Sequence, residues 1–144
     1  MRHLTKILVA VGLMFVLFPA SQTNIQASLK LSDIHVIRHL PEKYSGGETI
    51  VVSLDIKPFL PTEGKIIEKV PDGWKLVAAT PPFIDRPFRN MYVWKTSDTC
   101  EIITSIKYTL EIPKGNRSRK EFTGYIDIGN IRLTIVGDRH IWGE

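Results

Sequence analysis

The sequence predicts an all-β fold built as a sandwich of two antiparallel sheets with about seven or eight strands. Apolar and polar residues alternate along most of the chain after residue 33, as in strands with one buried and one solvated face. Turns rich in Pro, Gly, Asn and Asp interrupt this alternation at roughly ten-residue intervals. Beyond residue 27, no segment combines a helical apolar period with capping residues.

Two segments, residues 49–56 and 105–112, show the alternation most clearly, and we expect their apolar residues to face the core. These are Ile50, Val52, Leu54 and Ile56 in the first segment and Ile106, Tyr108, Leu110 and Ile112 in the second. Val51 is the one apolar residue on the predicted solvent face. Shorter strands are predicted at residues 34–38, 65–70, 74–78, 91–96, 122–128 and 131–136.

The N-terminal residues are predicted to be a secretory signal peptide. Arg2 and Lys6 provide a positive start, and residues 7–18 form an apolar run shorter than the roughly 20 residues of a bilayer span. Cleavage after Ala27 is preferred, and cleavage after Ala20 or retention as an anchor stay as alternatives. The predicted organisation is a signal peptide at 1–27, a flexible leader at 28–33, the sandwich at 34–138 and a C-terminal tail at 139–144.

Composition argues against a nucleic-acid partner. The chain has 19 Lys and Arg residues, two of them in the signal peptide, and 15 Asp and Glu residues, so the remaining chain has a formal charge of +2. A nucleic-acid binder is expected to carry a concentrated basic face. The basic residues 114–120 (KGNRSRK) are interpreted as a solvated loop, with a weak contact to an anionic surface as the alternative.

The sequence also predicts no catalytic residues, no metal and no cofactor. His35 and His39 would lie about 13 Å apart along one strand, which is too far for both to bind one metal ion. Nucleophile-elbow, phosphate-loop and dinucleotide motifs are absent from the sequence. Cys100 is the single cysteine, so it is either a quiet thiol or one that pairs between chains.

Residues 81–90 (PPFIDRPFRN) are the predicted partner-contact loop. The loop carries Phe83, Arg86, Phe88 and Arg89, which are residue types enriched at binding hot spots. The competing interpretation is a loop folded back over the open end of the sandwich.

Three aromatic residues, Tyr92, Trp94 and Trp142, are candidates for stacking on a ligand. The preferred alternative places Trp74 and Trp94 in the core, because large rings dominate the interior of a sandwich.

The stretch Pro71-Asp72-Gly73-Trp74 predicts a structural turn between two strands. Pro71 restricts φ, Gly73 accepts the positive φ that the corner of a hairpin requires, and Trp74 begins the next strand pointing into the core.

Several short motifs coincide with the predicted strands and turns. They are ETIVVSLDI at 48–56, EKVPDGW at 68–74, YVW at 92–94, IKYTLEIPKG at 106–115, FTG at 122–124 and VGD at 136–138. In this pattern the chain resembles the Ig-like domains of bacterial and archaeal extracellular and cell-surface proteins, over residues 34–138. The resemblance implies an Ig-like sandwich and no catalytic residues. Such domains usually sit in long multidomain chains, whereas this one is expected to stand alone after a signal peptide.

We therefore expect a secreted, non-enzymatic Ig-like module in the extracellular space or cell envelope. Its partner would be another protein or a cell-surface or wall component, with no stable membrane span after signal cleavage. Docking would use an unpaired sheet edge, or the burial of Phe83 and Phe88. The alternatives are a small carbohydrate- or ligand-binding module and, third, an enzyme of unrecognised type.

Overall fold

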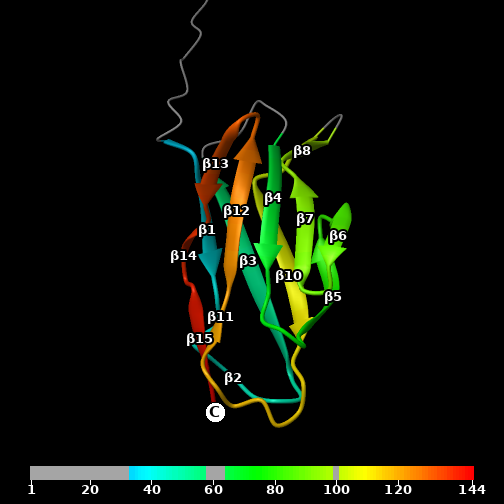
Figure 1. Ribbon diagram of the computed structural model, residues 1–144, viewed down its shortest axis with the longest axis vertical. Helices are drawn as coiled ribbons and strands as arrows, with labels where there is room; N and C mark the ends of the chain where they lie inside the picture. Colours follow the sequence, from blue (N-terminus) through cyan, green and yellow to red (C-terminus); the bar gives the residue numbers. More distant parts are fainter. Residues whose placement is uncertain (1–32, 58–63, 99–100) are drawn as a thin grey trace, which may run out of the picture.

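The computed structural model describes residues 33–57, 64–98 and 101–144, and these residues form an all-β sandwich (Figure 1). The predicted fold class is thus confirmed. None of the described residues forms a helix long and apolar enough to cross a membrane. The predicted signal peptide, nearly all of the leader and Cys100 lie outside the described residues.

The first large sheet contains β1 (His35–His39), β3 (Thr49–Lys57), β5 (Lys75–Thr80), β10 (Ser105–Glu111) and β14 (Val136–Gly137). Their order in space is β14–β1–β3–β10–β5, so β14 and β5 are its edges. The strands pair antiparallel except β1 and β14, which are parallel.

The second large sheet contains β4 (Gly64–Lys69), β6 (Asp85–Phe88), β7 (Met91–Lys95), β12 (Thr123–Ile128) and β13 (Ile131–Thr134). Their order is β13–β12–β4–β7–β6, and all neighbours are antiparallel. Two small sheets complete the described structure. They are formed by β11 (Lys120–Glu121), β15 (His140–Gly143) and β2 (Lys43–Tyr44), and by β8 (Ser97–Asp98) and β9 (Glu101–Ile102).

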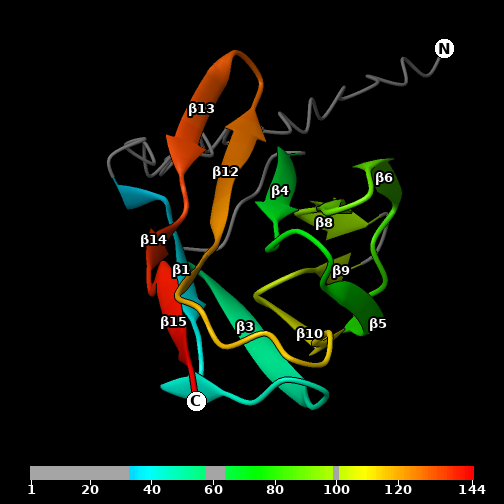
Figure 2. The same ribbon diagram turned by 60° about the horizontal axis from the view of Figure 1, so that its bottom comes forward.

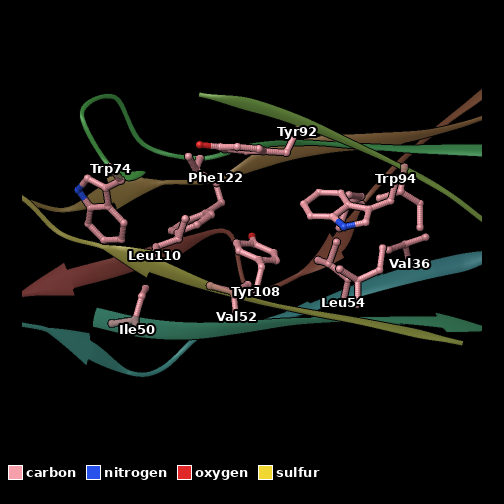
Figure 3. Close-up of a cluster of buried hydrophobic side chains, with 14 of the residues drawn as sticks. Val36, Ile50, Val52, Leu54, Trp74, Tyr92, Trp94, Tyr108, Leu110 and Phe122 are labelled. Carbon is pink, nitrogen blue, oxygen red and sulfur yellow. The ribbon is translucent and has the colours of Figure 1, made fainter. Parts of the chain in front are cut away.

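The core lies between the two large sheets and includes the residues that the alternation predicts to face inward (Figure 3). All eight apolar residues predicted to face inward from residues 49–56 and 105–112 are buried, and Val51 is 60% exposed on the outer face of β3. Trp74 and Trp94 are buried as well, which confirms the preferred core interpretation. Each buried Leu, Ile or Phe side chain stabilises the fold by about 1.5–3 kcal/mol relative to exposure.

The structure corrects the predicted C-terminal tail. Residues 140–143 form β15, which pairs with β11 and lies parallel to β2, and Ile141 is fully buried. A strand of four residues is too short to show a clear alternation, and its two partners contain only two residues each. The sandwich therefore extends almost to the last residue of the chain.

The turn after β4 has the predicted backbone but a different role. Trp74 N donates to Pro71 O at 3.2 Å, and Gly73 has a φ of 82°. However, β4 belongs to the second sheet and β5 to the first, so the turn is not the corner of a hairpin. It carries the chain from one sheet to the other and delivers Trp74 into the space between them.

Gly73→Val is expected to lower the free energy of unfolding by roughly 1–3 kcal/mol, because a β-branched residue is strained at this positive φ. Gly73→Asn is the matched control, since Asn adopts a left-handed backbone more readily than Val does. Its free energy of unfolding should fall by less than about half of the loss expected for Gly73→Val. Urea unfolding of both variants provides the measurement. Equal losses for Val and Asn would show that backbone strain is not the cause.

A buried ion pair joins the two sheets inside the core. Arg38 of β1 donates to Glu68 of β4 through Nε at 2.6 Å and through Nη2 at 2.8 Å. The hydroxyl of Tyr108, on β10, donates to the same carboxylate at 2.8 Å. Arg38 Nη1 also donates to the backbone oxygen of Asp138 at 3.0 Å. Both charged side chains are almost completely buried, and their hydrogen bonds compensate the cost of removing them from water.

Gly124 leaves the space that this pair needs. A Cβ at Gly124 would lie 2.5 Å from Glu68 Oε2 and 2.7 Å from Ile67 O. The strand β12 can therefore pass directly beside the carboxylate only because residue 124 has no side chain. Burial raises the pKa of Glu68, and the hydrogen bonds from Arg38 and Tyr108 oppose that shift.

The free energy of unfolding is expected to fall above about pH 10. Burial, followed by the neighbouring Glu68 carboxylate, raises the pKa of Tyr108 well above its usual value. The unfolded chain therefore loses the Tyr108 proton near about pH 10 while the folded chain keeps it, which costs about 1.4 kcal/mol per pH unit. Urea unfolding between about pH 8 and about pH 11 measures this slope. Tyr108→Phe should make it shallower, and an unchanged slope would contradict the assignment.

Candidate protein-contact surface

The predicted contact loop contains a strand, β6, that forms an edge of the second sheet. Among the described strands it pairs only with β7, and it lies on the same side of the sandwich as β5, an edge of the first sheet (Figures 1 and 2). A short strand with Pro87 in its middle shows no alternation, which explains why the sequence predicts a loop here.

The beginning of this segment is fastened to the core. Trp94 Nε1 donates to Pro81 O at 3.0 Å. The ring of Phe83 packs edge-on against Tyr92 and Trp94, with ring centres 5.2 and 6.4 Å apart. Phe83 is still 37% exposed, so it both anchors the segment and contributes apolar surface.

The end of the segment is fastened to the turn at Pro71. Asn90 Nδ2 donates to Val70 O at 3.2 Å and also to Asp72, and Val70 N donates to Asn90 O at 2.9 Å. Arg86 Nε donates to Arg89 O at 3.0 Å. These contacts fix the β6–β7 turn against the inter-sheet turn.

Between these anchors the chain is exposed to solvent, and we call four of its exposed side chains the β6 surface: Ile84, Arg86, Phe88 and Arg89. Phe88 is 66% exposed and Ile84 is 50% exposed. The guanidinium of Arg86 lies 5.1 Å from the centre of the Tyr92 ring, which holds it beside the strand. The structure thus brings together three of the four predicted contact residues, and it adds Ile84.

The edges on this side are poorly suited to the addition of another strand. In the pairing of β5 with β10, Thr109 and Leu110 face Ala78 and Leu76, so Val77 is the extra residue of a β-bulge. The pairing of β6 with β7 is also irregular, and Pro87 removes one donor. Bulges and prolines protect edges from strand addition, so side-chain docking is the favoured mode of contact.

A cavity of about 390 Å³ lies beside the β6 surface. It is lined by the inter-sheet turn and the β6–β7 turn, through Asp72, Gly73, Trp74, Lys75, Arg86, Arg89 and Asn90. Two of the predicted contact residues and three of the predicted structural-turn residues therefore form one concave site.

Two of the three candidate stacking rings are unavailable to a ligand. Tyr92 and Trp94 face the interior and are buried, and the hydroxyl of Tyr92 accepts a hydrogen bond from Leu76 N at 3.3 Å. Trp142 on β15 is 59% exposed, with the guanidinium of Arg119 at 5.4 Å from its ring centre. The alternation predicted the strand of Tyr92 and Trp94 correctly, but their shared face is the core.

The described part of the chain contains no group of three or more His, Cys, Asp and Glu side chains arranged to hold a metal ion. His39 Nε2 lies 3.2 Å from Asp55 Oδ2 on the exposed face of the first sheet. Sequence reasoning missed Lys75 and Asn90, which become part of the cavity only when the two turns meet. No local pattern marks such residues.

No protein-family model and no curated protein matches the chain. A solved structure that it resembles is the cupredoxin domain of amoB from Nitrosocaldus yellowstonii, at 12% sequence identity and a TM-score of 0.36. The match covers 67% of this chain and 54% of that one, so this chain spans about half the length of its structural neighbour. The feature of the chain that bears on function is therefore its own geometry, an all-β sandwich in which the edge strand β6 is held at both ends and exposes apolar side chains.

Proposed function

We propose that this protein is a secreted, non-enzymatic Ig-like module that binds another protein in the extracellular space or cell envelope. Binding uses the β6 surface. The observation that carries the proposal is the exposure of Phe88, at 66%, in a segment whose start is fastened to the core and whose end is fastened to the inter-sheet turn. Because the strand is held in place, little backbone entropy is lost on binding.

The composition of the β6 surface supports a protein partner. An exposed Phe and Ile, flanked by Arg86 and Arg89, combine the apolar area and the charged groups of a binding hot spot. Burial of Phe88 alone would contribute about 1.5–3 kcal/mol. Binding to a wall polymer by charge would leave the exposed Phe88 and Ile84 unused, so the mixed surface favours a protein.

Phe88→Ala is expected to leave folding intact and weaken partner binding by at least about tenfold, since the lost burial is worth about 1.5–3 kcal/mol. The partner is captured from the envelope and secreted fractions by a photo-reactive residue at position 88. Val51→Ala and a photo-reactive residue at position 51 are the matched controls, because Val51 is 60% exposed on β3, in the other large sheet. A captured protein counts as the partner only if Phe88→Ala prevents its binding and Val51→Ala does not. Equal capture at both positions would refute the proposal.

A carbohydrate-binding role is the second candidate, and it is supported by the exposure of Trp142 alone. Arg119 already lies over that ring, so a sugar would have to displace it or use the opposite face. A panel of wall oligosaccharides should leave the fluorescence of the protein unchanged if the β6 surface is the binding site. Saturable quenching that Trp142→Ala abolishes would instead favour this second function.

A further inference from the structure

The cavity beside the β6 surface carries an excess of positive charge. Lys75, Arg86 and Arg89 line it together with a single acidic residue, Asp72. Asp72 already accepts a hydrogen bond from Asn90. In the described part of the chain, no hydrogen bond or ion pair engages the charged groups of Lys75 and Arg89. Two cations are thus free to meet an anion in this cavity.

One residue of the cavity lining also carries a buried donor without an acceptor. Trp74 lines the cavity and is buried, and its Nε1 has no hydrogen-bond partner among the described residues. Figure 3 shows this nitrogen pointing away from the other core side chains. A buried N–H without an acceptor is costly, and such groups in folded proteins are usually satisfied by water or a ligand.

The basic lining and the concave shape of the cavity together fit a small anionic group. A cavity of about 390 Å³ lies at the lower end of the range for ligand sites, so it takes a side chain but not a polymer. A carboxylate matches the donors, because its two oxygens accept from guanidinium and ammonium groups at once.

We propose that this cavity receives the carboxylate of an acidic side chain from the protein partner. The inference rests on the proposed function, because Arg86 and Arg89 belong both to the β6 surface and to the cavity lining. The partner segment therefore places an apolar side chain on Phe88 and an Asp or Glu side chain in the cavity. Lys75 and Arg89 supply the charge that selects an acidic segment.

The test uses N-acetylglutamate as the probe and the indole N–H resonance of Trp74 as the readout, at low salt to limit screening. A ligand of this size should half-saturate the site at roughly 1–10 mM. Lys75→Gln combined with Arg89→Gln should raise that concentration by about fivefold or more. Lys57→Gln combined with Lys107→Gln is the matched control, since both lysines are exposed on other strands, and it should change little.

N-acetylglutamine amide, in which neutral amides replace both carboxylates, should give no saturable shift. Absence of a shift with N-acetylglutamate, or a shift that the Lys75 and Arg89 changes leave untouched, would overturn the inference. Tighter binding of inorganic phosphate would overturn the assignment to a carboxylate. If N-acetylglutamate fails while partner binding still depends on Phe88, only this inference falls. If N-acetylglutamate binds while Phe88→Ala leaves partner binding unchanged, the proposed function falls, and with it the assignment to a protein partner.

Discussion

Arg38→Met is expected to lower the free energy of unfolding by about 3–5 kcal/mol, as for other buried pairs that lose one partner. The substitution leaves the Glu68 carboxylate buried with only the Tyr108 hydroxyl as a side-chain donor. The total free energy of unfolding of a domain is about 5–15 kcal/mol, so the variant would be close to unfolding. Urea unfolding followed by tryptophan fluorescence provides the measurement.

The double variant Arg38→Met with Glu68→Leu is the control for this prediction. Replacing both charges with apolar side chains of similar volume removes the uncompensated carboxylate, and such replacements are often neutral or stabilising. We expect the double variant to recover most of the stability that Arg38→Met loses. A single variant within about 1 kcal/mol of the parent would show that the pair does not hold the sheets together.

Trp94→Ala is expected to lower the free energy of unfolding by about 3–5 kcal/mol, the usual cost of removing a buried aromatic side chain. Trp94 is fully buried, packs against Tyr108 with ring centres 5.7 Å apart, and donates to Pro81 O. The variant should therefore lose core packing and also release the start of the β6 segment.

Trp94→Phe separates these two roles. It keeps much of the ring in the core but removes the donor to Pro81 O. We therefore expect a smaller loss in the free energy of unfolding than for Trp94→Ala. The free energy of partner binding should fall by more than the free energy of unfolding does. Partner binding that is unaffected by Trp94→Phe would contradict the role of Pro81 as an anchor of the β6 surface.

Much of the fold is readable from the sequence, because β1, β3 and β10 alternate between buried and more exposed residues. The eight predicted strands are all present, and the inward faces of β3 and β10 are correct residue by residue. The short strands β6 and β15 show no clear alternation, which is why a loop and a tail are expected there. The role of the turn at Gly73 depends on which sheet β5 joins, and local sequence does not determine that.

The buried ion pair left a signal that the sequence prediction did not use. Glu68 shares the inward face of its strand with Ile66 and Val70, and Arg38 follows Val36 on the inward face of β1. A charge at an inward position requires a partner of opposite charge. By contrast, the cavity at Lys75 and Asn90 arises from the meeting of two turns that are distant along the chain.

The structure connects the core to the proposed function through a few hydrogen bonds. Trp94 and Asn90 hold the two ends of the β6 segment, so Phe88 is presented on a support that the sandwich makes rigid. Sites on rigid elements bind with less entropic cost than sites on loose loops. This is why loss of the anchors should weaken binding even though they do not touch a partner.

The most direct test of the central claim is the dissociation constant of the captured partner, measured with the parent protein, Phe88→Ala and Val51→Ala. We expect Phe88→Ala to raise it by at least about tenfold, with an unchanged unfolding curve, and Val51→Ala to leave it within about twofold. Equal dissociation constants for the parent and Phe88→Ala would contradict a contact through the β6 surface.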